Sequence, residues 1–149
     1  MIYENTTAHK ALTNRLDLRK DVELFLLWCE FLDPLDRAIM HQVYEHGQTF
    51  DELAAFLGVT TKIASNRVNT TAERVRSPAY RFIVRNFGVL PAELRVVADM
   101  RFLRGYSRNW TVKQSSETLA TVRIKDQAIQ WIIDATPALV QVNYSSLFR

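Results

Sequence analysis

Polar and basic side chains recur between residues 60 and 76, in a stretch whose apolar residues have helical spacing. Lys62 is suited to the acceptors of guanine and Asn66 to adenine, as in readout of the DNA major groove. The arginines suit phosphate oxygens, which position a helix on the duplex without reading its sequence. Alternatively, each residue is an ordinary polar group on a solvated helix face. The candidate DNA-binding residues are Thr60, Thr61, Lys62, Ser65, Asn66, Arg67, Asn69, Arg74 and Arg76.

The distribution of charge favours a polyanionic partner for the same region. The formal net charge is only +3, but residues 1–60 sum to −5 and residues 61–149 to +8. Ten basic residues lie between Lys62 and Arg108, opposed by three acidic ones. A one-sided basic segment in a small protein is typical of nucleic-acid binding. An arginine-rich face that is merely solvated would have the same composition.

No group of residues indicates an enzyme. His9, His41 and His46 lack metal-ligand spacing, and the last two lie about 500° apart around a helix, on different faces. Cys29 follows an apolar run and is expected to be a buried, inert thiol. No glycine-rich phosphate loop occurs. We therefore expect neither catalysis nor a bound metal or cofactor.

The composition predicts an all-α, cytoplasmic protein. Hydrophobic residues make up 48% of the 149 residues and charged residues 23%, which excludes a disordered or fibrous chain. Four glycines and four prolines are few for a fold of many short strands. A single cysteine excludes a disulfide framework. The longest apolar run, residues 24–29, is too short to span a bilayer, and no secretion signal opens the chain.

Helix signals surround the candidate residues. Thr49–Glu52 has the pattern of a capping box, which opens a short helix that ends at Gly58. Thr60 is expected to cap a longer helix over about 61–76, and Val59 to fill the space between the two helices. This order of a short helix, a turn with glycine and a second helix is typical of a helix-turn-helix. The side chains expected to face the core are Ile63, Ala64, Val68, Ala72 and Val75.

Two helices are predicted before this motif. One covers about 11–32, with a break expected at 18–21, and its acidic, apolar character would suit a dimer or partner contact. The other runs from Pro34 to about residue 46 and ends at Gly47. The three tryptophans, Trp28, Trp110 and Trp131, are expected in the core or in interfaces. The core side of the second helix is expected to hold Leu35, Ala38, Ile39 and Val43.

The stretch from Phe31 to Arg76 resembles region 4 of sigma-70-type RNA polymerase sigma factors. The resemblance rests on Leu-Asp-Pro-Leu-Asp-Arg-Ala-Ile at 32–39, Thr-Phe-Asp-Glu-Leu-Ala-Ala-Phe-Leu-Gly-Val-Thr at 49–60, and the runs 66–68 and 73–76. It covers about a third of the chain. It implies a helix-turn-helix whose second helix reads a promoter element, with RNA polymerase as a further partner. No segment before it resembles the helix that melts promoter DNA, so a DNA-binding module is expected rather than an initiation factor.

The second half contains a possible divergent copy of the motif. Arg37 and Gly47 recur at one common offset as Arg95 and Gly105, and the run 60–63 recurs at a slightly larger offset as 121–124. The three additional residues are expected within 106–110. Asp126 would repel phosphate there. The alternative is a plain helical cap on the first motif. The residues equivalent to the first DNA-binding set would be Arg123, Lys125, Gln127 and Gln130.

These observations predict three parts: a helical segment at 1–32, a sigma-region-4-like helix-turn-helix at 33–88, and a second helical unit at 89–149 whose tail resembles a strand at 140–144. The expected function is sequence-specific DNA binding in transcriptional control, with double-stranded DNA as partner. The alternative is a protein-interaction module that docks on RNA polymerase or another regulator. A homodimer is the further partner considered, and no membrane contact is expected.

Overall fold

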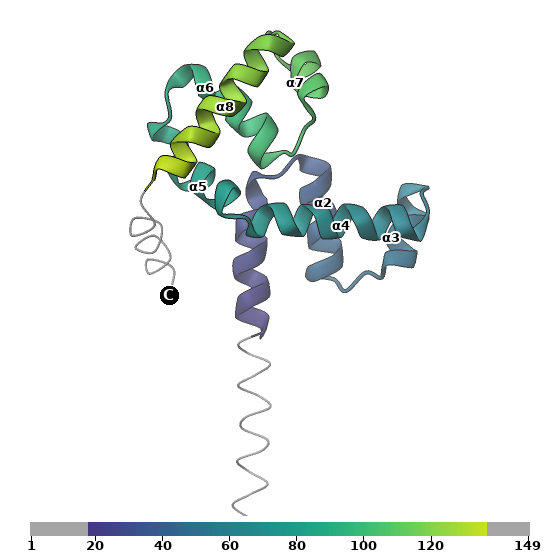
Figure 1. The fold of residues 1–149 in the computed structure, drawn as a ribbon. Coiled ribbons are helices and arrows are strands. Elements are labelled where there is room, and N and C mark those ends of the chain that lie inside the picture. Colours follow the sequence, from purple (N-terminus) through teal and green to yellow (C-terminus); the bar gives the residue numbers. More distant parts are fainter. Residues whose placement is uncertain (1–17, 137–149) are drawn as a thin grey trace, which may run out of the picture. The chain divides into compact units, whose positions relative to one another are not determined.

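The computed structural model describes residues 18–136, and every regular element within them is a helix (Figure 1). The all-α class is therefore confirmed for these residues. The chain divides into two compact units, of which the first ends at Asn69 and the second begins at Thr70. This boundary lies within helix α4 (Thr61–Arg76), whereas the sequence placed a boundary after residue 88. The division into functional domains stays a prediction, and the strand expected at 140–144 lies outside the described residues.

The described part of the first unit starts with a continuous helix. Residues 18–28 are helical, so the predicted break at 18–21 is wrong, and a 3-10 turn η1 (Cys29–Phe31) follows. Leu26 and Trp28 of this helix are buried, and Cys29 is fully buried, as expected. Leu18, Leu24 and Leu27 are exposed. The helix thus belongs to the core of its own unit while part of its apolar surface remains outside.

Helix α2 (Pro34–Tyr44) buries Ile39 as predicted, but its buried side is turned away from Leu35 and Ala38. Asp36, Ile39 and Met40 are buried, whereas Leu35 is 46% exposed and Ala38 is exposed too. The reason is electrostatic: Arg67 Nε donates a hydrogen bond to Asp36 Oδ1 at 2.8 Å, which compensates the buried carboxylate. Because buried residues recur every three or four positions on a helix, turning Asp36 inward moves Leu35 to the flank.

Helices α3 (Phe50–Leu57) and α4 start and end as predicted. Thr49 Oγ1 accepts from the Glu52 N–H at 3.2 Å, and Thr60 Oγ1 accepts from the Ile63 N–H at 3.2 Å. Gly58 ends α3 with φ 69°, a left-handed conformation that glycine adopts without steric cost. Two expectations about the core are wrong, because Val59 is exposed and Ile63 is 54% exposed. The core side of α4 consists of Ala64, Val68, Thr71, Ala72 and Val75.

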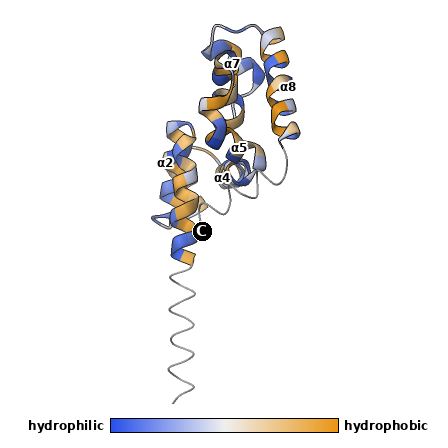
Figure 2. Ribbon diagram, turned by 90° about the vertical axis from the view of Figure 1, so that its left-hand side faces the viewer, coloured by the Kyte–Doolittle hydropathy of each residue, from blue (hydrophilic) through white to orange (hydrophobic). Residues whose placement is uncertain are grey.

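The second unit contains the remaining helices, α5 (Pro78–Asn86), η2 (Phe87–Val89), α6 (Ala92–Val97), the π-helical η3 (Ala98–Leu103), α7 (Arg108–Gln114) and α8 (Leu119–Ala135). Ser77 ends α4 and caps α5, with its Oγ accepting from the Tyr80 N–H. Helix α5 packs on η3, and α7 packs on α8. Hydrophobic residues recur along α7 and α8 (Figure 2). Fully buried side chains include Tyr80, Ile83, Val97, Val122 and Ile129.

Three helices of each half start at a constant offset in the sequence. The start of α2 at Pro34 corresponds to that of α6 at Ala92, Phe50 of α3 to Arg108 of α7, and Thr61 of α4 to Leu119 of α8. The caps keep this offset, since Thr49 corresponds to Ser107 and Thr60 to Thr118. The expected insertion within 106–110 is therefore wrong, and Thr118 rather than Thr121 is the counterpart of Thr60.

No helix within residues 18–136 has both the length and the apolar character required to cross a membrane.

Candidate nucleic-acid interface

The outward face of α4 in the first unit is polar. Lys62, Asn66 and Asn69 are all exposed, and Asn66 lies about 200° around the helix from the buried Ala64. Their side chains form no hydrogen bond or ion pair with other described residues. The structure thus brings together three of the predicted residues, which present one ammonium group and two amides to solvent.

The residues at the start of α4 are engaged within the protein. Thr60 Oγ1 caps the helix, and Thr61 Oγ1 donates to Asp51 Oδ1 of α3 at 2.7 Å. Ser65 Oγ donates to the Lys62 carbonyl at 3.1 Å. These three predicted residues therefore stabilise the start of α4 and do not add free polar groups to its outward face. Ile63, which the sequence analysis had assigned to the core, lies exposed among them and offers an apolar contact of the kind that reads a thymine methyl group.

Two of the three predicted phosphate ligands have structural roles. Arg67 anchors α4 to α2 through Asp36, although its side chain is still 43% exposed. The guanidinium of Arg74 lies directly against Gly105, in the space that a Cβ at that glycine would need, and the Arg74 side chain is largely withdrawn from solvent. Arg76 is exposed at the end of α4. The exposed parts of this set are thus Arg76, which also interacts within the protein, and the outer nitrogens of Arg67.

The basic segment 62–108 uses much of its charge internally. Arg95 donates to the carbonyls of Leu90 and Gly88, and Arg104 pairs with Asp99 at 3.2 Å. Burial raises the pKa of Asp99, and Arg104 opposes this rise. Arg101 and Arg108 pair with another carboxylate, described next. The excess of positive charge in the sequence is therefore not equivalent to an exposed basic surface.

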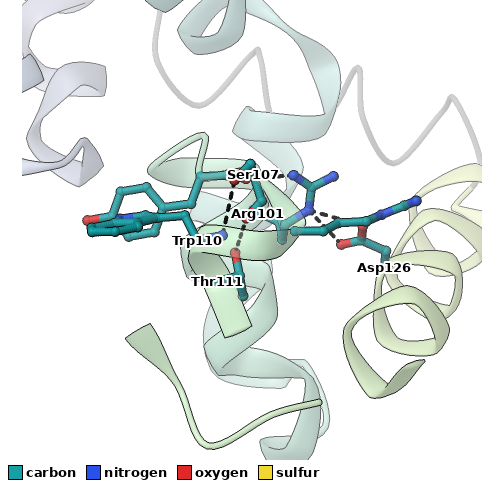
Figure 3. Close-up of polar contacts among 7 residues, drawn as sticks. Arg101, Ser107, Trp110, Thr111 and Asp126 are labelled. Atoms are coloured by element: carbon teal, nitrogen blue, oxygen red, sulfur yellow. Dashed lines mark hydrogen bonds and ion pairs between the residues drawn. The ribbon is translucent and has the colours of Figure 1, made fainter. Parts of the chain in front are cut away.

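Asp126 is the centre of a charge cluster in the second unit (Figure 3). It is buried on α8, with Arg101 Nε and Arg108 Nε each 3.0 Å from Oδ2. The expectation that Asp126 would repel phosphate is therefore wrong, because its charge is directed inward and compensated. Close by, Ser107 accepts from the Trp110 N–H, and Thr111 donates to the Ser107 carbonyl. The cluster joins η3, the start of α7 and α8.

Three residues of the predicted second DNA-binding set, Arg123, Gln127 and Gln130, lie on one side of α8, and Lys125 lies apart from them. Arg123 and Gln127 are exposed. Lys125 Nζ contacts Glu117 Oε1 at 2.5 Å, and Gln130 donates to Asp134 at 2.9 Å. The side of α8 opposite its buried residues carries Ile124 and Trp131 instead. Trp110 is exposed as well, so only Trp28 of the three tryptophans lies in the core.

A groove of about 770 Å³ lies between the helix at 18–28 and α2 in the first unit. On its rim, His41 Nδ1 is 2.7 Å from Glu45 Oε2, and His41 Nε2 is 3.5 Å from Glu30 Oε1. The hydrogen bond with His41 lowers the pKa of the Glu45 carboxyl. No group of three or more metal-ligating side chains is found within residues 18–136. The lining residues are Leu18, Arg19, Val22, Glu23, Leu26, Leu27, Glu30, His41, Tyr44 and Glu45.

No protein-family model matches the chain, and neither a curated protein nor a solved structure is significantly similar to it.

Proposed function

We propose that the protein binds double-stranded DNA in transcriptional control, with α4 as the recognition helix. The observation that carries this proposal is the outward face of α4. Lys62, Asn66 and Asn69 are exposed opposite the buried side, and donors and acceptors of this kind read base edges in the major groove. The exposed Ile63 adds an apolar contact at the start of the helix, which is the part that reaches the bases in a helix-turn-helix.

The order of helices supports a helix-turn-helix in the first unit. A short α3 with a hydroxyl cap, a left-handed Gly58 and a longer α4 with its own cap follow one another within residues 49–76. This agrees with the resemblance of residues 31–76 to sigma region 4. The constant offset between helix starts supports a second, divergent copy formed by α6 with η3, α7 and α8. In this proposal only the first copy reads DNA.

The alternative function is docking on an acidic or apolar protein surface, such as RNA polymerase or another regulator. The internal pairing of Arg67, Arg101 and Arg108 favours it, because paired arginines contribute less to phosphate binding. The two functions predict different responses to salt and to loss of Lys62, and the following measurement separates them.

Fluorescence anisotropy of a labelled random-sequence 25-mer duplex, titrated with the full chain at about 50 and 200 mM salt, tests DNA binding. With two phosphate contacts, from Arg67 and Arg76, the affinity should fall roughly 12-fold over this range, since log K falls by about 0.9 per contact for each decade of salt. Absence of binding at the lower salt would refute the proposal and favour a protein partner.

Variants then test the recognition face. Lys62→Ala and Asn66→Ala should relax the base preference obtained by selection from a random DNA pool, because each removes a donor to base edges, worth about 1–3 kcal/mol of discrimination. Lys113→Ala removes the same charge from an exposed position on α7 and should leave the preference unchanged. An unchanged preference in both α4 variants would show that this face does not read DNA.

A further inference from the structure

The outward face of α8 is apolar at several positions where α4 is polar. At the offset that relates the two helices, Lys62 corresponds to Ala120, Asn66 to Ile124, and Glu73 to Trp131. Ile124 is 70% exposed and Trp131 is 65% exposed. Ala120 and Ala135 are also exposed, one at each end of the helix. Of the three recognition residues on α4, only Asn69 has a polar counterpart on α8, the exposed Gln127. The second unit therefore presents a helix face with fewer of the polar groups that read bases.

Helix α8 does not need this face for its own fold. Val122, Asp126, Ile129 and Ile133 form its buried side. Trp131 lies about 180° around the helix from Val122, directly opposite that side. Large apolar side chains gathered on one exposed stripe of a helix are typical of an interaction surface.

We propose that this face binds the same face of a second copy of the chain, with the two α8 helices antiparallel. A two-fold axis passing between Gln127 and Ala128 places Ile124 of one copy opposite Trp131 of the other. The same axis places Ala120 opposite Ala135, so that the small side chains allow close approach at both ends. An isologous contact requires such a self-complementary surface.

The charges on the flank of this face are also self-complementary. Arg123 and Asp134 lie about 100° and 120° around the helix from Val122, on the same side of the apolar stripe. In the antiparallel pair, Arg123 of one copy lies only about 3 Å along the axis from Asp134 of the other, which is two steps of helical rise. Each dimer therefore contains two such ion pairs. Gln130 Nε2 donates a hydrogen bond to Asp134 Oδ1 of the same helix at 2.9 Å.

This pattern fits a second copy better than it fits DNA. Asp134 occupies the position equivalent to Arg76 of α4, and a carboxylate there opposes phosphate. One pair of helices is a small interface, so the dimer should form at micromolar rather than nanomolar concentrations. The inference does not depend on the proposed DNA binding, because its test contains no DNA.

Sedimentation equilibrium of the full chain between about 10 and 200 µM tests the dimer. The average mass of the unmodified protein should rise toward twice the monomer mass. Ile124→Glu and Trp131→Glu should remain monomeric, because a charge is then buried at the centre of the contact. Val89→Glu, which places the same charge at an apolar site of the second unit that is 81% exposed, should dimerise normally. Circular dichroism establishes that each variant is folded.

A charge exchange tests the geometry. Arg123→Asp and Asp134→Arg should each weaken the dimer at least fivefold, and a 1:1 mixture of the two variants should form heterodimers more strongly than either variant alone. Within one helix these residues are too far apart to interact, so this rescue requires contact between copies. A monomeric unmodified protein at the highest concentration would overturn the proposal. Dimerisation unaffected by Ile124→Glu, or absence of rescue in the mixture, would overturn this interface.

Discussion

Gly47 and Gly105 adopt the same left-handed backbone, with φ of 68° and 72°, at equivalent positions of the two halves. Their surroundings differ. Nothing lies within 4 Å of the place where a Cβ would stand at Gly47, whereas the guanidinium of Arg74 occupies that place at Gly105. One glycine is thus required by its backbone alone, and the other also by a close side-chain contact. This pair allows the two causes to be measured separately.

Gly47→Ala should lower the free energy of unfolding by about 1 kcal/mol, the cost of a left-handed alanine. Gly105→Ala should lower it by about 2–3 kcal/mol, because the Arg74 guanidinium must also leave its site. Urea denaturation of both variants gives the comparison. In the Gly105→Ala protein, adding Arg74→Ala should remove the part of the stability loss that exceeds the loss in Gly47→Ala. The same addition to Gly47→Ala should bring no such recovery. Equal losses of stability at the two glycines would contradict a contact between Arg74 and Gly105.

At the scale of elements, α4 and α8 share their starts and caps but differ inside. Val68 in the core of α4 corresponds to Asp126 in α8, where Arg101 and Arg108 surround the carboxylate. Loss of one partner from a buried ion pair leaves uncompensated charge, while replacement of the whole cluster by apolar residues need not destabilise. At this position the first unit therefore has an apolar core contact and the second unit has an ionic one.

Asp126→Ala should destabilise the protein by about 2–3 kcal/mol, less than for a fully buried pair because Arg108 is 48% exposed. The expected reason is that two guanidinium groups lose their shared acceptor. Thermal unfolding followed by circular dichroism measures the loss. Replacing both arginines by Met in the Asp126→Ala background should recover part of the stability, and no recovery would show that packing rather than charge causes the loss.

At the scale of the whole molecule, the two units carry different surfaces on equivalent helices. The first unit presents a polar face on α4, and the second presents an apolar face on α8. Taken together, the two proposals describe a protein whose first unit reads DNA and whose second unit joins two copies. A two-fold symmetric dimer would favour a DNA site with two inverted half-sites.

The full chain should therefore bind a duplex with two inverted copies of its selected half-site cooperatively, at one of a series of spacings across a helical turn of about 10.5 bp. The Ile124→Glu variant should bind the two half-sites independently. Its affinity for a duplex with a single half-site should equal that of the unmodified protein. Electrophoretic mobility shifts distinguish the outcomes. Failure to bind a single half-site would contradict the function of α4, whereas independent binding by the unmodified protein would contradict the dimer.

Local effects along the chain explain what could be predicted from the sequence alone. The starts of α2, α3 and α4 and the turn at Gly58 follow from Pro34, Thr49 and Thr60, whose effects reach only three or four residues along the chain. The all-α class and the burial of Cys29 follow from composition and periodicity in the same way. These features depend on neighbours in sequence, so they are visible before the chain folds.

Only the tertiary structure decided which polar residues face inward. Asp36 is buried because Arg67, 31 residues away, compensates it, and Asp126 is buried because Arg101, 25 residues away, does so. The periodicity of apolar residues does not reveal such distant partners. The same ion pairs also engage arginines that the charge count had assigned to an exposed basic surface. The sequence by itself therefore determined the helices and their caps. Long-range ion pairs determined which of their faces remain available for binding.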